Sequence, residues 1–135
     1  MAFVLDASVA GTWLFKDERT AFTQVMFDRA AREQAIVPTL WWFEVRNLAV
    51  MTERRRRVTP TQTEIFLLGI EELWIVPDDL AVSDDLMRLA REHRLTAYDS
   101  AYLELARRLD LELATLDQRL VDAARSEGVK VAGDS

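Results

Sequence analysis

Brief apolar runs alternate along the chain with longer segments in which apolar residues recur every three or four positions. The brief runs, bounded by polar or proline positions, predict short strands at residues 3–5, 36–38, 74–77 and 112–115. The periodic segments predict helices at residues 9–15, 18–33, 40–53, 60–73, 99–109 and 118–126, and a further helix that includes Leu86 and ends near residue 94. Gly128 stops the last helix, and the apolar segment 129–131 ends the pattern.

Strands that alternate with helices in this way predict an α/β sandwich around a mostly parallel central sheet. The chain has 135 residues, half of them hydrophobic, which is the usual size of one compact domain. We therefore expect residues 1–135 to form a single domain. In such sheets, ligand sites form outside the carboxyl ends of the strands, so residues that directly follow strands are considered first.

Nothing in the pattern indicates a membrane segment. The longest apolar run, residues 36–43, covers roughly eight residues, whereas a transmembrane helix needs about 18 or more. Asp6 interrupts the N-terminal apolar run and no basic region precedes it, so we expect no secretory signal. The chain contains no cysteine, which excludes disulfides and zinc–thiolate sites. We expect a cytoplasmic protein.

Four carboxylates lie where apolar runs begin or break. Asp6 and Asp117 each follow a predicted strand, Asp99 opens a strongly periodic helix, and Glu44 is the acid within an aromatic stretch. An acid on an apolar helix face is costly to bury unless it is paired or binds a metal ion. Because hard divalent cations prefer oxygen ligands, the four acids predict a site for a divalent metal ion that folding assembles.

Each acid also has a simpler interpretation. Asp99 and Asp117 are good helix N-cap residues, and Asp6 is a common turn residue. Glu44 could pair with an arginine, although its neighbour Arg46 does not face it on a helix. Ser8 is a poor candidate nucleophile because the only histidine, His93, would have to be its base, and we expect His93 to be a surface residue.

The net charge of −6, from 17 basic and 23 acidic residues, argues only weakly against a nucleic-acid partner. Two bound divalent cations would add about +4 and bring the total nearer to about −2. Positive charge is also concentrated in the run Arg54, Arg55, Arg56 and Arg57. This run is either the solvated end of a helix or a contact for nucleic-acid phosphates.

The acidic segments resemble those of a known family. Residues 4–8 (VLDAS), Glu44, residues 95–102 (LTAYDSAY) and residues 113–117 (LATLD) are similar to the acidic motifs of PIN-domain ribonucleases. Within that family, the length of the chain resembles the VapC toxins of toxin–antitoxin pairs. The resemblance covers essentially the whole chain.

The resemblance implies a PIN-like α/β/α sandwich, a Mg²⁺ or Mn²⁺ site and endonucleolytic cleavage of RNA. It assigns metal-binding and water-activating roles to Asp6, Glu44, Asp99 and Asp117, with Ser8 and Thr115 as polar supports. It also implies a homodimer and a VapB-like antitoxin, a segment of which packs in a groove beside the active site. The many aromatic residues fit such interfaces, and we expect one of Trp41 and Trp42 to point away from the core.

Other functions remain open at this point. A phosphatase of the haloacid-dehalogenase type also uses an aspartate after the first strand, but it needs a second acid where this chain has Ser8. A housekeeping PIN-domain RNA-processing nuclease would carry the same acids as a toxin. A non-catalytic PIN-fold binding module would keep the fold and the interface without metal-dependent turnover.

Overall fold

The computed structural model describes residues 1–134. These residues contain a four-stranded sheet in the order β3-β2-β1-β4, and every pair of neighbouring strands is parallel. The strands are β1 (Ala2–Leu5), β2 (Gln34–Pro38), β3 (Ile75–Asp78) and β4 (Leu113–Ala114). The predicted α/β class and parallel sheet are confirmed.

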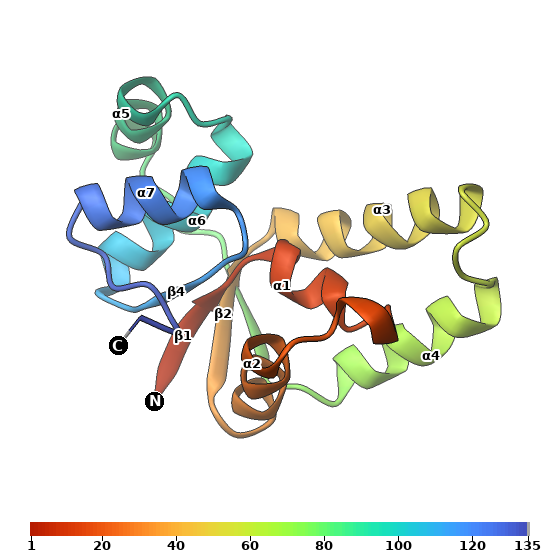
Figure 1. Cartoon of the computed structure of the whole chain (residues 1–135). Coiled ribbons are helices and arrows are strands. Elements are labelled where there is room, and N and C mark those ends of the chain that lie inside the picture. Colours follow the sequence, from red (N-terminus) through yellow and green to blue (C-terminus); the bar gives the residue numbers. More distant parts are fainter. Residues whose placement is uncertain (135) are drawn as a thin grey trace.

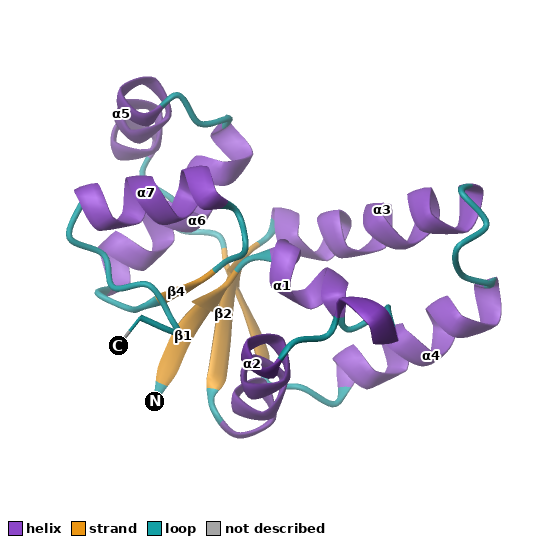
Figure 2. Cartoon of the chain, viewed as in Figure 1, coloured by secondary structure: helices purple, strands orange, loops and turns teal. Residues whose placement is uncertain are grey.

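Helices cover both faces of this sheet (Figures 1 and 2). On one side lie α1 (Ala7–Thr12), α2 (Ala21–Arg32), α3 (Leu40–Arg54) and α4 (Pro60–Glu71). On the other side lie α5 (Ser83–His93), α6 (Ala97–Leu109) and α7 (Gln118–Ser126). No helix within residues 1–134 is long and apolar enough to cross a membrane.

Helix starts follow the capping chemistry of the sequence. The Thr59 side chain accepts from the Gln62 backbone and the Gln62 side chain accepts from the Thr59 backbone, a reciprocal capping box ahead of α4. Helix α2 begins at Ala21 rather than at residue 18, because Thr20 and Thr23 form a second box. The residues before it, Lys16–Glu18, form the 3₁₀ turn η1.

Three other expectations differ from the structure in detail. The helix predicted at residues 9–15 is α1, which covers Ala7–Thr12. Helix α6 begins two residues before Asp99, because the Thr96 side chain caps it by accepting from the Asp99 backbone N–H. The segment 129–131 contributes only one parallel bridge, between Val131 and Leu113. These differences are local and leave the predicted architecture unchanged.

The core fixes the position of the carboxyl ends of the central strands. Phe3, Val4 and Leu5 of β1 are fully buried, as a strand covered on both faces requires.

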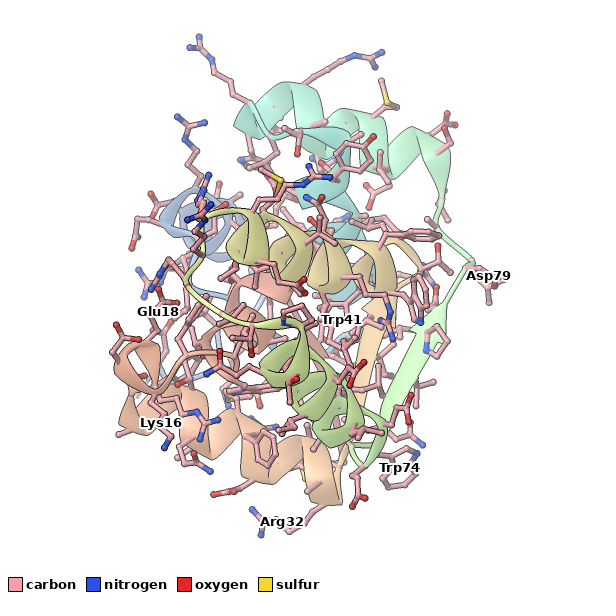
Figure 3. The ribbon with its side chains drawn as sticks, turned by 90° about the vertical axis from the view of Figure 1, so that its right-hand side faces the viewer. Lys16, Glu18, Arg32, Trp41, Trp74 and Asp79 are labelled. Atoms are coloured by element: carbon pink, nitrogen blue, oxygen red, sulfur yellow. The ribbon has the colours of Figure 1, made fainter. Side chains whose placement is uncertain are left out.

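Of the two adjacent tryptophans on α3, Trp41 is 2% exposed and Trp42 is 53% exposed. The prediction that one of them points away from the core is therefore confirmed. Figure 3 shows Trp41 between the ribbons of α3 and α4, with Trp74 and Asp79 near the two ends of the edge strand β3.

Gly11 allows α1 to lie close to α3. A methyl group at this position would collide with the Leu48 side chain of α3, so only glycine fits without a shift of Leu48. The close approach matters because α1 directly follows Asp6 and α3 carries Glu44. Packing of these two helices therefore sets the separation of two predicted site residues.

Candidate functional site

Asp6 follows β1 at the carboxyl edge of the sheet. Its backbone takes the N-cap position of α1, but its side chain caps nothing. Instead, its Oδ2 accepts hydrogen bonds from the Ser8 and Thr115 hydroxyls, both at 2.7 Å. The residue is 7% exposed, and burial raises the pKa of its carboxyl group, with the Asp99 charge adding to this and the two hydroxyls opposing it.

Thr115 links Asp6 to the segment that carries Asp117. It follows β4, the neighbour of β1, so its hydroxyl reaches Asp6 across adjacent strand ends. The same Oγ1 accepts from the Asp117 backbone N–H at 3.0 Å, and Ser8 Oγ accepts from the Leu116 backbone N–H at 3.0 Å. These contacts give Ser8 and Thr115 the geometry of the supports that the sequence predicts.

Glu44 lies in the second turn of α3, half-buried, and its partner is a tyrosine rather than an arginine. The Tyr102 hydroxyl of α6 donates to Glu44 Oε1 at 2.5 Å. Burial raises the pKa of Glu44, the Asp6 and Asp99 carboxylates raise it further, and the Tyr102 hydroxyl opposes the change. Arg46 instead stacks on the Trp42 ring, 3.7 Å from its centroid.

Asp99 completes a group of three interacting acids. It lies in the first turn of α6, and its carboxylate raises the pKa of both Asp6 and Glu44. Asp6, Glu44 and Asp99 therefore come together from β1, α3 and α6 although they are far apart in the sequence. Within residues 1–134, none of the three forms an ion pair with a basic side chain.

Asp117 lies next to this group, but its side chain makes a helix-capping hydrogen bond. Its Oδ1 accepts from the Arg119 backbone N–H at 2.9 Å, so it caps α7. The capping interpretation from the sequence is thus correct for Asp117, whereas for Asp99 the cap is Thr96. Capping uses one oxygen and leaves Oδ2 of Asp117 without a side-chain or backbone donor among the described residues.

The acids suit a divalent cation that keeps part of its water shell. No three of them place ligand oxygens within 4.8 Å of one another in the part of the chain that the structure describes. Mg²⁺ is usually bound by one or two carboxylates together with waters and substrate phosphate oxygens, so wider spacing fits it. Asp6 is buried and Glu44 and Asp99 are partly buried, and mutually repelling carboxylates without a basic partner favour a cation electrostatically.

One other group, Glu92, His93 and Glu127, does place its ligand atoms within 4.8 Å of one another. The negative charge of Glu127 is already neutralised, because Glu127 pairs with Arg88 at 2.9 Å and with Arg107 at 3.3 Å. His93 is 12% exposed and its Nε2 lies 2.6 Å from Glu127, so it is less exposed than the predicted surface position and it has an acidic partner. We interpret this group as an ion-pair network that joins the ends of α5, α6 and α7.

The arginine run lies at the far end of α3 from the acids. Arg54 ends the helix, ten residues after Glu44, which corresponds to a rise of about 15 Å. Arg57 pairs with Glu18 at 3.3 Å and lies over the Phe15 ring. Arg54, Arg55 and Arg56 form no ion pair among residues 1–134, so at least three positive charges are free at this loop.

Tyr102 is the site residue that the sequence analysis missed. The helical pattern correctly assigns it to the buried face of α6, and a buried core position is all that the pattern indicates. Two features of the sequence could have indicated a role at the site. Tyr102 lies three residues after Asp99 and therefore on the same side of the helix. A buried tyrosine hydroxyl also needs a hydrogen-bond partner.

Fold and site together define a class: an all-parallel α/β sandwich with interacting acids at the carboxyl edge of its sheet. The PIN domain model matches residues 3–126. The chain therefore belongs to the PIN domain family, whose members are generally nucleases.

Two solved structures are similar in fold. PAE2754 from Pyrobaculum aerophilum superposes with a TM-score of 0.66 at 22% identity, covering 91% of this chain and 87% of that one. FitAcB from Neisseria gonorrhoeae gives a TM-score of 0.67 at 19% identity, covering 97% of this chain and 96% of that one. At these identities the likeness concerns the fold alone. No curated protein matches the chain.

Proposed function

We propose that this protein is a Mg²⁺- or Mn²⁺-dependent endoribonuclease that hydrolyses RNA phosphodiester bonds. The convergence of Asp6, Glu44 and Asp99 without a neutralising cation supports the proposal most directly. These three acids would hold the metal, with Asp117 Oδ2 as a fourth ligand group and Ser8 and Thr115 orienting Asp6. When bound, divalent ions in such sites activate water and stabilise the leaving oxygen.

Cleavage of a structured RNA pool under metal titration tests this activity. The purified protein should cut RNA in Mg²⁺ or Mn²⁺ and lose activity in excess EDTA. The Asp99→Asn variant is the matched inactive control, because it removes one charge at an unchanged volume. Failure of the wild-type protein to cut RNA with either metal would favour a non-catalytic binding module on the same fold.

We further propose that the nuclease is the toxin of a toxin–antitoxin pair, as the resemblance to VapC proteins implies. A groove of about 610 Å³ between the end of α1, α2 and α4 supports a protein partner. Its rim carries Lys16, Asp17, Arg19 and Arg57, and Arg57 pairs with Glu18, which leaves a small excess of positive charge on a chain of net charge −6. Its lining is aromatic and aliphatic, and includes Trp13, Phe15, Phe27, Ile65, Phe66 and Ile70. An antitoxin segment with apolar and acidic residues would suit it.

Gene context and a surface variant test the antitoxin proposal. A small antitoxin gene should precede the toxin gene, and its product should relieve growth arrest on co-expression; a housekeeping nuclease would lack both properties. Ile65→Asp, at an exposed position lining the groove, should weaken the complex while leaving RNA cleavage unchanged. Leu68→Asp, at an exposed position of the same helix outside the groove, is the matched control.

A second apolar surface supports the proposed homodimer. Four exposed apolar side chains follow two neighbouring strands. Trp42 and Phe43 come after β2, and Leu80 and Val82 come after β3. Large exposed apolar side chains grouped on one face mark protein interfaces. Phe43→Glu should shift the mass measured by light scattering from dimer to monomer, and an unchanged dimer would place the interface elsewhere.

A further inference from the structure

Tyr102 joins the two helical layers of the protein at the acidic site. It is fully buried on α6, while its acceptor, Glu44, belongs to α3 on the opposite side of the sheet (Figure 1). The bond is short, at 2.5 Å between the hydroxyl oxygen and Glu44 Oε1. The phenol also lies close enough to Asp6 and Glu44 for both charges to act on it. Tyr102 thus contacts the site directly, in contrast to an ordinary core tyrosine.

Two acids of this site, Asp6 and Glu44, are oriented by neutral hydroxyl groups. Ser8 and Thr115 donate to Asp6, and Tyr102 donates to Glu44. An arginine or lysine in these places would orient the carboxylates equally well, but it would also neutralise them and repel a metal ion. A hydroxyl fixes the side chain and leaves the negative charge available.

We propose that Tyr102 is a positioning residue that holds Glu44 through Oε1, leaves Oε2 free for a divalent cation, and thereby sets the metal affinity of the site. The inference rests on the proposed metal-dependent function. Partners that orient metal-binding carboxylates commonly change metal affinity or activity by about 10–100-fold when they are removed.

Tyr102→Phe removes the hydroxyl and keeps the buried ring. We expect Mn²⁺ binding, measured on the protein without RNA by electron paramagnetic resonance, to weaken about 10-fold or more. RNA cleavage should fall at low Mn²⁺ and recover towards the wild-type kcat at high Mn²⁺, while KM for RNA stays unchanged. Tyr98→Phe is the matched control, because Tyr98 is the only other tyrosine, lies on the same helix and is exposed.

A double-mutant cycle separates positioning from a general loss of packing. In the Glu44→Gln background, Tyr102→Phe should have little further effect on Mn²⁺ affinity, because the carboxylate that it orients is already gone. Equal, additive losses in both backgrounds would overturn the proposal, as would wild-type Mn²⁺ affinity in Tyr102→Phe. If the wild-type protein itself binds no Mn²⁺ and cuts no RNA, the proposed function fails first, and the inference fails with it.

Discussion

At the residue scale, the Asp6 carboxylate is buried beside other acids, and no basic side chain among residues 1–134 pairs with it. Two hydroxyl donors offset part of the desolvation cost, but the net effect of burial still raises its pKa. Asp6 therefore disfavours folding of the metal-free protein at neutral pH. A residue that is retained at such a cost is a good candidate for function.

Asp6→Asn should abolish metal-dependent cleavage while leaving the metal-free protein as stable as the wild type or more so. The folded-state pKa of Asp6 is raised above its ordinary value of 3.8, so the destabilisation from its ionisation is complete above the folded-state pKa. This cost shrinks as the pH falls below the folded-state pKa and is absent below the ordinary value. The gain in melting temperature from Asn should thus be largest at neutral pH and shrink in acid. Retained metal-dependent cleavage in both Asp6→Asn and Asp99→Asn would refute the site assignment.

At the element scale, the acidic site and the Glu127 network occupy opposite ends of the same helices. Helix α6 carries Asp99 in its first turn and Arg107 in its last, and α7 begins after Asp117 and ends before Glu127. The network of Glu127 with Arg88, His93 and Arg107 ties α5, α6 and α7 together. It therefore fixes the helices on which two of the site acids depend.

Glu127→Gln should lower the stability of the protein at neutral pH by about 1.5–3 kcal/mol, the cost of losing charged hydrogen bonds. Ion pairing lowers the pKa of Glu127 from 4.5 to about 2. Its contribution is thus complete above about pH 4.5 and is lost as the pH falls through about 2. Urea titrations across this range should show the deficit of the variant disappearing in acid.

Glu92→Gln is the control for this experiment. Glu92 pairs with Arg88 in the same network, but its side chain is 56% exposed. Exposed pairs contribute about 0–1 kcal/mol, so the control should change stability little at any pH. Equal losses in the two variants would mean that Glu127 has no special role in joining the helices.

The loop between α3 and α4 is the second element with a testable role. If Arg54 and Arg55 contact RNA phosphates, replacing both with glutamine should reduce the salt dependence of RNA binding by about 0.7 log units of slope per lost contact. The matched control removes Arg91 and Arg94, which are exposed near the end of α5. An unchanged slope in the Arg54/Arg55 variant would identify the run as a solvated helix end.

At the scale of the whole molecule, apolar patterning together with capping signals predicted the α-helices and strands of residues 1–134 and the parallel α/β class, but not the 3₁₀ turn η1. The finer differences come from side-chain caps: Thr20 and Thr96 start their helices at positions that apolar spacing does not reveal. Their positions at the ends of apolar runs, and their resemblance to known motifs, led to the prediction that Asp6, Glu44, Asp99 and Asp117 share one site. The sequence could not show that Asp117 also caps α7 or that Tyr102 bonds Glu44, because both depend on packing between distant segments.

The chemical groups at the ends of the RNA fragments distinguish between the possible cleavage mechanisms. Within residues 1–134 the only histidine is held by Glu127, so no histidine pair is available to activate the ribose 2′-hydroxyl. Carboxylates suited to hard cations instead favour direct attack of water on the phosphorus with loss of the 3′ oxygen. The fragments should carry a 5′-phosphate and a free 3′-hydroxyl, which mass spectrometry identifies. Cyclic 2′,3′-phosphate ends, or full activity in excess EDTA, would refute metal-dependent hydrolysis even if RNA is cut.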